Sequence, residues 1–333
     1  MTNKSELSFQ VILITWKRKD LLRKCLSSLR EAGIDLSSQL ILVINGRDLE
    51  TVEMLESEFP ELGYEQINQT SPSAARNFAL KSCNTTWAYF IDDDSWVEKD
   101  YFNKASTYLD ALYNTAVFGG PDFTPQDSSL FQKAIGKTLT SPLATASTRY
   151  RHSKNDSSTS NPVPCNEKKL ILCNLWINTE VLNRHKLKFP SELGRNEENL
   201  LLYQLEKLGE KLYYVEDLFV YHQRSNDIKS VFHKAWLSGF YRMKSFLAEP
   251  SSIEFIFFIP AIFILYLISI PLICSVIYTA PLALYVILVL YFSIRKGSLS
   301  NPLELGMIAL LHLVINLAYG LGSLSGLIKK DAY

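Results

Sequence analysis

The sequence predicts an α/β fold, with a mostly parallel sheet flanked by helices, followed by a helical region that enters a membrane. Three observations predict it. Short apolar segments alternate with amphipathic helical patterns between residues 8 and 92. Polar side chains follow the predicted strands at their carboxyl ends, the edge at which open α/β sheets bind ligands. Residues 251–333 are strongly apolar, with only four Lys or Arg and three Asp or Glu.

The first predicted strand, Phe9–Thr15, is almost wholly apolar, as expected for a parallel strand covered on both faces. A helix is predicted after it, with Asp20 as its cap and Gly33 at its end. The same alternation then continues through a strand at 40–44, a helix ending near Pro60, a strand at 64–67, a helix at 74–81 introduced by Ser71-Pro72-Ser73, and a strand at 87–91.

Composition excludes several classes of protein. The 333 residues carry 34 Lys or Arg and 34 Asp or Glu, without a basic run, so no nucleic-acid partner is indicated. The five cysteines show no C-x-x-C spacing, which predicts buried thiols in a reducing compartment rather than a zinc site or disulfides. The apolar run at 11–14 is too short for a signal peptide, so we expect the polar part of the chain to stay in the cytoplasm.

Three consecutive carboxylates, Asp92, Asp93 and Asp94, follow the strand at 87–91. Because unpaired buried charge is costly, such a cluster is expected where a strand opens into a polar crevice. Asp92 and Asp94 project to the same side of an extended chain, and hard oxygen ligands of this kind suit Mg²⁺ or Mn²⁺. The alternatives are a solvated acidic loop and a helix cap at Asp94 or Ser95.

The chain lacks the glycine-rich phosphate-binding motifs that often follow a first strand. Phosphates would have to be held by a metal and by cations such as Lys17, Arg18 and Arg76. Each of these three, taken alone, is more typical of a solvated surface charge.

An ordered set of motifs over about residues 8–224 resembles the family 2 glycosyltransferases, which have the GT-A fold. The motifs are Val11-Ile12-Leu13-Ile14-Thr15-Trp16-Lys17-Arg18, Ala74-Ala75-Arg76-Asn77, Asp92-Asp93-Asp94 after Phe90-Ile91, Asn196-Glu197-Glu198-Asn199-Leu200 and Val220-Tyr221-His222. More loosely, residues 119–150 and the apolar tail resemble membrane-bound transferases of succinoglycan-type exopolysaccharide synthesis.

The resemblance implies roles for single residues. The metal, Mn²⁺ or Mg²⁺, would be held by Asp92, Asp94 and His222. One departure concerns the segment after the second strand, where Ile44-Asn45-Gly46-Arg47 lacks the aspartate that usually contacts the base, so the nucleotide is left open. The nucleotide-sugar, with a UDP-sugar as the expected donor, would be bound by Thr15, Lys17, Arg18, Asn45, Arg76, Asn77, Asp92 and Asp93.

Glu198 stands where the family has its base, and Glu197 is the alternative. A carboxylate within reach of the acceptor hydroxyl can take its proton during an inverting transfer. The other interpretation is that both glutamates favour the first turn of a helix at 198–208 through its dipole.

Residues between the acidic triplet and this pair are the expected acceptor region. Arg149 and Arg151 begin a polar segment running to Pro162, which either covers a diphosphate or is an idle surface loop. Asn174 and Trp176 lie in and after a predicted strand at 170–174 that resembles the family's acceptor-facing strand. Trp176 would stack on a sugar ring or be buried in the core.

The predicted domains are a GT-A catalytic domain at 1–226, a basic amphipathic helix at 227–250 and about three membrane spans within 251–333. Apolar runs at 255–274, 276–294 and 306–328 are the candidate spans. Basic residues before the first and after the second favour the cytoplasmic side, but Lys329-Lys330 would then lie outside unless the third segment is re-entrant.

Together these features predict an inverting, metal-dependent glycosyltransferase, multi-pass in the cell inner membrane or plasma membrane with its catalytic domain in the cytoplasm. It would transfer a sugar to a polyprenyl-diphosphate-linked saccharide in polysaccharide or glycan biosynthesis. The alternatives are transfer to polyprenyl phosphate and a catalytically inactive membrane scaffold. The absence of a Q-x-x-R-W segment argues against a processive synthase.

Overall fold

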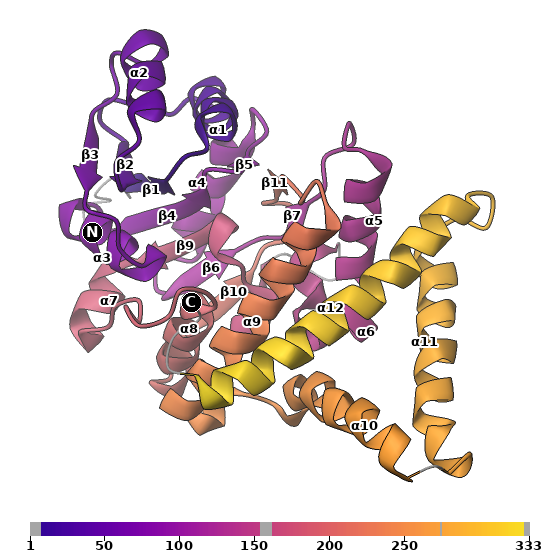
Figure 1. Cartoon of the computed structure of the whole chain (residues 1–333). Coiled ribbons are helices and arrows are strands. Elements are labelled where there is room, and N and C mark those ends of the chain that lie inside the picture. The colour runs from indigo at the N-terminus through magenta and orange to yellow at the C-terminus, as the bar shows by residue number, and fades with distance from the viewer. Residues whose placement is uncertain (1–7, 154–161, 274, 330–333) are drawn as a thin grey trace. The chain divides into compact units, whose positions relative to one another are not determined.

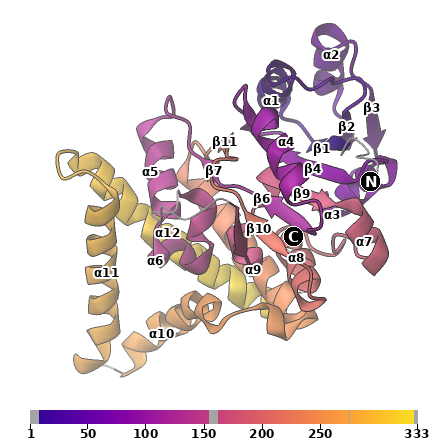
Figure 2. The ribbon, with the colours of Figure 1, turned by 180° about the vertical axis from the view of Figure 1, so that it is seen from behind.

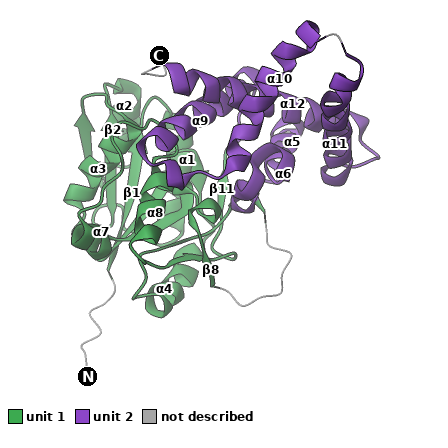
Figure 3. Cartoon of the chain, turned by 90° about the horizontal axis from the view of Figure 1, so that it is seen from below, with its two compact units in different colours: residues 1–123, 153–223 green, residues 124–152, 224–333 purple. Residues whose placement is uncertain are grey.

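The computed structural model describes residues 8–153, 162–273 and 275–329 and divides the chain into two compact units (Figures 1 and 3). Unit 1 contains residues 1–123 and 153–223, and unit 2 contains residues 124–152 and 224–333. The predicted polar segment after Arg151 lies largely outside the described residues.

Unit 1 is built on a mixed sheet with the strand order β3-β2-β1-β4-β9-β6-β10-β8. The first four strands in the chain are parallel neighbours, as predicted, whereas β9 runs antiparallel between β4 and β6. The strands are β1 (Phe9–Thr15), β2 (Leu40–Asn45), β3 (Tyr64–Ile67), β4 (Trp87–Asp92), β6 (Val117–Gly119), β8 (Val163–Cys165), β9 (Leu175–Asn178) and β10 (Leu212–Tyr214).

Helices cover both faces of this sheet and bury two hydrophobic clusters. One face packs against α1 (Lys19–Glu31), α2 (Leu49–Glu58) and α4 (Tyr101–Ala111). The other packs against α3 (Pro72–Ser82), α7 (Thr179–His185) and α8 (Glu197–Lys207). This three-layer α/β/α arrangement explains why β1 and β4 are apolar on both faces.

A second, three-stranded sheet lies beyond the end of β4 (Figure 2). It consists of β5 (Ser95–Trp96), β11 (Val220–His222) and β7 (Asp122–Phe123). In its register His222 pairs with Ser95, and Val220 pairs with Asp122. The small sheet therefore brings three distant parts of the chain to the acidic triplet.

Several predicted boundaries shift. The strand expected at 170–174 is a 3₁₀ turn at Leu172–Asn174, and the strand itself follows as β9. Ser71 caps α3, as its position before Pro72 predicts. α1 already begins at Lys19, and α8 begins at Glu197 after Asn196 in the left-handed conformation.

Unit 2 is wholly helical in its described residues. Its helices are α5 (Leu130–Leu139), α6 (Pro142–Thr145), α9 (Ile228–Ala248), α10 (Ile259–Ile273), α11 (Ala280–Lys296) and α12 (Pro302–Ile328). Asp227 caps α9, and its side chain accepts a hydrogen bond from the Ser230 N–H. Three segments, Phe255–Ile273, Ile277–Lys296 and Pro302–Ile328, are long and apolar enough to cross a membrane.

Candidate active site

The acidic triplet lies where the central strand β4 leaves the sheet. β4 is hydrogen-bonded between β1 and β9, and Ile14 of β1 pairs with Asp92 at its end. The three carboxylates then turn toward different partners. Asp92 is the most open, with 34% of its side chain exposed, whereas Asp93 and Asp94 are buried. The triplet therefore spans the boundary between the buried sheet and the solvent, and a crevice at this point stays a prediction.

Asp93 faces back toward the end of β1. It accepts hydrogen bonds from Thr15 Oγ1 at 2.8 Å and from Arg18 Nη1 at 3.0 Å. Burial raises the pKa of Asp93 to about 6, although the Arg18 guanidinium opposes the rise. The same Arg18 nitrogen lies 3.0 Å from Asp94 Oδ2, so one guanidinium holds two carboxylates of the triplet.

Asp94 continues into a chain of three groups through His222. His222 Nε2 lies 3.1 Å from Asp94 Oδ1, and His222 Nδ1 lies 2.6 Å from Asp122 Oδ2. Burial lowers the pKa of His222, but the neighbouring Asp94 and Asp122 carboxylates outweigh it, and the pKa rises well above its ordinary value. One imidazole thus bridges two buried carboxylates.

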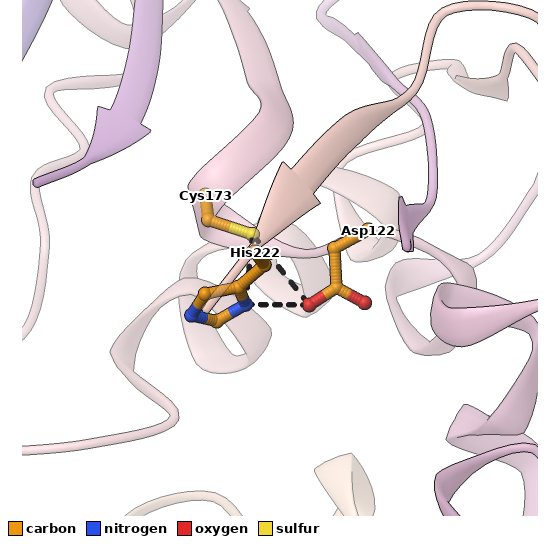
Figure 4. A group of neighbouring side chains, drawn as sticks. All are labelled: Asp122, Cys173 and His222. Atoms are coloured by element: carbon orange, nitrogen blue, oxygen red, sulfur yellow. Dashed lines mark hydrogen bonds and ion pairs between the residues drawn. The ribbon is translucent and has the colours of Figure 1, made fainter. Parts of the chain in front are cut away.

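Figure 4 shows Asp122, Cys173 and His222 pointing toward one another. The Cys173 Sγ lies 3.8 Å from His222 Nδ1 and 4.0 Å from Asp122 Oδ2, distances that a metal ion could bridge. The chemistry of these side chains disfavours a metal ion between them. Burial raises the pKa of Cys173 to about 12, which keeps a thiol rather than a thiolate, and the 2.6 Å contact of Asp122 with Nδ1 is a short hydrogen bond.

The opposite ring nitrogen fits a metal ion better. Two ligands at right angles on Mn²⁺ or Mg²⁺ are about 3 Å apart, since each bond is about 2.0–2.2 Å. The 3.1 Å between His222 Nε2 and Asp94 Oδ1 matches that separation. A metal-binding imidazole commonly gives its other nitrogen to a carboxylate, which Asp122 supplies. The residues present therefore fit a divalent cation on the Asp94 side of His222.

The glutamate pair reaches the triplet through Arg76. Arg76 Nη1 forms an ion pair with Glu197 Oε1, 121 residues away in the sequence, while Arg76 Nη2 lies 3.4 Å from Asp92 Oδ1. Burial raises the pKa of Glu197 to about 7, with Arg76 opposing and Glu198 adding to the rise. Glu198, the next residue in the first turn of α8, is buried as well.

Three predicted nucleotide-site residues are engaged by their own chain. The Asn45 amide exchanges two hydrogen bonds, both 3.0 Å, with the backbone of Thr70. The Asn77 amide does the same with the backbone of Phe189, at 2.7 and 2.9 Å. Lys17 has a φ of 54° and donates its backbone N–H to Asp48. These contacts position the loops around the strand ends, so direct contact of the three side chains with a nucleotide stays a prediction.

Asn174 and Trp176 are not acceptor-facing, because both side chains are fully buried. The Trp176 ring stacks on Tyr89 and Phe118, and its Nε1 donates to Tyr101 at 3.1 Å. The Asn174 amide donates to the Leu218 carbonyl at 2.6 Å. The buried alternative for Trp176 is the one found, and the acceptor role predicted for both residues is wrong.

Arg149 and Arg151 belong to unit 2, in a 3₁₀ helix at Ala146–His152. The Arg149 guanidinium lies 4.4 Å from the centre of the Tyr150 ring and donates to its hydroxyl. Their role toward an acceptor stays a prediction.

The sequence analysis did not identify Asp122 and Asp48 as residues of the candidate site. Asp122 directly follows the Gly119-Gly120-Pro121 segment at the end of a strand, and a carboxylate at such an end is the signal that could have found it. Asp48 caps α2 and accepts the Lys17 N–H, so it ties β1 to β2 at the site edge.

The chain has a GT-A fold, with carboxylates gathered at the carboxyl end of the central strand. Residues 10–173 match the model of the family described as Glycosyl transferase family 2. This part of the chain is a family 2 glycosyltransferase domain, and the protein is a glycosyltransferase.

A solved structure of low sequence identity shares the fold. The mannosyltransferase PcManGT from Pyrobaculum calidifontis, in complex with GDP-Man and Mn²⁺, has a TM-score of 0.56 at 13% identity, covering 97% of this chain and 88% of that chain. S. aureus TarS 1–349, in complex with UDP-GlcNAc, has a TM-score of 0.49 at 13% identity, covering 96% of this chain and 91% of that chain. No curated protein sequence matches.

Proposed function

We propose that the protein is an inverting, metal-dependent glycosyltransferase that moves a sugar from a nucleotide-sugar, expected to be a UDP-sugar, to a polyprenyl-diphosphate-linked saccharide. The reaction would take place at the cytoplasmic face of the cell inner membrane or plasma membrane, in polysaccharide or glycan biosynthesis. One observation carries the proposal. Arg76 joins Glu197, the neighbour of the expected base Glu198, to Asp92, while Asp94 contacts His222; these contacts support a shared site for the expected base and the expected metal ligands.

The donor side of the site combines carboxylates with two arginines. A divalent cation bound there would act as a Lewis acid on the departing diphosphate. Asp94 and His222 would hold the cation, with Asp92 beside them and Asp122 orienting the imidazole. Arg18 and Arg76 present guanidinium groups at the same strand ends, and these suit the paired oxygens of a diphosphate. PcManGT, which shares the fold, binds GDP-Man and Mn²⁺, which supports a nucleotide-sugar donor here.

The acceptor side needs a base for the attacking hydroxyl. Glu197 is committed to Arg76, and its pairing holds the start of α8 against the triplet. We therefore assign the base to Glu198 and a positioning role to Glu197, with the roles exchanged as the alternative. The apolar helices of unit 2 support an acceptor that is itself anchored in lipid.

Glutamine variants of the two glutamates test the assignment. Glu198→Gln should lower turnover on the order of 10²–10⁴-fold, because Gln cannot take the proton, while nucleotide-sugar affinity measured by calorimetry persists. Glu192→Gln, at an exposed position shortly before α8, is the matched control and should keep wild-type rates. Wild-type turnover in Glu198→Gln together with loss of turnover in Glu197→Gln would show that Glu197 is the base. Wild-type turnover in both variants would contradict the proposal.

Product analysis distinguishes a polyprenyl-diphosphate-linked acceptor from polyprenyl phosphate. The purified full chain in detergent, supplied with Mn²⁺ and a panel of nucleotide-sugars, should elongate a polyprenyl-diphosphate-linked sugar. Transfer to polyprenyl phosphate instead would overturn the proposed acceptor. An absence of metal-dependent donor hydrolysis and of transfer to either lipid would favour the inactive scaffold.

A further inference from the structure

The three apolar helices of unit 2 differ in how they are packed. In the most apolar stretch of each segment, the share that is buried is 17% for Phe255–Ile273, which contains α10, and 11% for Ile277–Lys296, which contains α11. In α12 that share is 44%. α10 and α11 expose large apolar side chains along their length, as lipid-facing helices do. α12 buries polar side chains instead, among them Glu304, His312 and Asn316.

The first half of α12 is bound to α5 and α6 by these polar groups. Lys137 Nζ lies 2.7 Å from Glu304 Oε1, and His312 Nε2 lies 2.9 Å from Ser141 Oγ. Asn316 Nδ2 donates to the Leu143 carbonyl at 3.1 Å. α5 and α6 lie within residues 124–152, a short excursion that leaves unit 1 and returns to it. That excursion is too short and too polar to cross a bilayer, so this half of α12 lies on the same side as unit 1.

The second half of α12 packs backbone to backbone against α9. A Cβ on Gly322 would come within 2.0 Å of the Trp236 carbonyl oxygen, and one on Gly326 within 2.5 Å of the Phe240 carbonyl oxygen. The partner positions increase together along both chains, so the two helices run parallel. Lys244 Nζ near the end of α9 donates to the carbonyl of Lys329, which directly follows α12.

α9 itself is not a membrane span. It carries Lys229, Lys234, Arg242 and Lys244 and does not belong to the helices that are apolar enough to cross. It begins at Ile228, so only four residues separate it from the end of unit 1 at Gln223. A helix packed in parallel along α9 cannot cross the bilayer while α9 stays at its surface.

α10 and α11 form a hairpin with both ends on α12 (Figure 1). A Cβ on Gly320 of α12 would meet the Pro260 carbonyl oxygen at 2.4 Å, and one on Gly297, just after α11, would meet the Leu305 side chain at 2.5 Å. The far end of the hairpin exposes Leu272 and Ile277, at 80% and 87%. Such a tip is suited to lipid rather than to water.

We propose that only the α10–α11 hairpin enters the lipid bilayer, and that α12 lies along the membrane surface on the side of unit 1. The exposed apolar positions of α12 form a stripe that fits the acyl boundary, and its other faces bind protein. Lys329, directly after α12, then lies on the same side of the membrane as the start of α10. This arrangement also places the basic groups on one side of the membrane, as the positive-inside rule requires: Arg242, Lys244, Arg295, Lys296 and Lys329.

Labelling from either side of sealed vesicles tests this. In the full chain with Cys83, Cys165 and Cys274 replaced by alanine, a single cysteine is introduced as Lys329→Cys and, for reference, as Asn103→Cys on the exposed surface of unit 1. A membrane-impermeant maleimide should label both positions from the same side only. Labelling of the two from opposite sides would overturn the proposal.

A second measurement does not depend on cysteine replacement. A fluorescent protein that matures only in the cytoplasm, fused after Tyr333 of the wild-type chain, should fluoresce as brightly as the same protein fused before Met1. Alkaline phosphatase, active only after export, should be inactive at both ends. Phosphatase activity at the C-terminus alone would show that α12 crosses. Neither result depends on the reaction that unit 1 performs.

Discussion

Unit 1 and unit 2 both bury polar side chains, but in opposite patterns. At the end of β4, three adjacent carboxylates are held by Arg18, Arg76 and His222, so like charges are concentrated at one point. Along α12, the buried polar groups are spread over successive turns, and each has its own partner on a neighbouring helix. Crowded like charge costs stability and persists at functional sites, whereas separately paired polar groups specify how helices dock.

The comparison teaches that burial of a polar residue does not by itself indicate a site. Asn174 is as buried as any residue of unit 1, yet its amide serves neighbouring carbonyls and hydroxyls. Asp122 is equally buried, but it acts on His222 and through it on Asp94. What separates the two is whether the partner is itself a group that can bind a ligand.

The largest effect is expected for Asp94→Asn in unit 1. Losing the carboxylate removes a predicted cation ligand and the partner of His222, so sugar transfer should fall on the order of 10³-fold. Mn²⁺ affinity measured by calorimetry should fall with it, while circular dichroism stays unchanged. Asp20→Asn, at an exposed surface ion pair with Arg23, is the control. Unchanged Mn²⁺ affinity in Asp94→Asn would place the cation elsewhere.

A smaller effect, on stability, is expected for glycines of α12. Gly322→Ala forces a Cβ against the Trp236 carbonyl and should cost about 1–3 kcal/mol, seen as a lower thermal midpoint in detergent. Gly306→Ala, in the same helix with open space around it, should instead stabilise by up to about 1 kcal/mol. Equal effects at the two positions would contradict the close packing of α9 on α12.

The smallest effect is a pH-dependent one at Glu206, a half-buried carboxyl of unit 1 outside the acidic triplet. Burial, with a hydrogen bond to Glu167, raises the pKa of Glu206 to about 8 from its ordinary 4.5. A raised carboxyl pKa means that stability is lost as pH rises from about 4.5 through 8. Glu206→Gln, which stays neutral, should therefore match the wild type at pH 5 and melt roughly 2–4 °C higher at pH 9. A lower midpoint at pH 9 would show that the ionised form is stabilised.

Much of the fold could be predicted because its signals are local. The alternation of apolar strands and amphipathic helices up to Asp92 requires only the periodicity of each segment. The triplet was recognisable because like charges directly after an apolar strand are uncommon, whereas the glutamate pair was identified through its place in the family's motif. The exact position and antiparallel direction of β9 and the small sheet around His222 were not predicted, because strands of two to four residues carry too little pattern.

The sequence by itself determined the order of strands and helices in the first half of the chain, the acidic strand end and the apolar tail, since each depends on residues close together along the chain. Only the tertiary structure decided that Asp122 would orient His222 across 100 residues, that Trp176 would lie in the core, and that α12 would pack on α5 and α9. These outcomes depend on which surfaces meet when the chain folds, and hydrogen bonds and close packing between distant segments leave no periodic trace in the sequence.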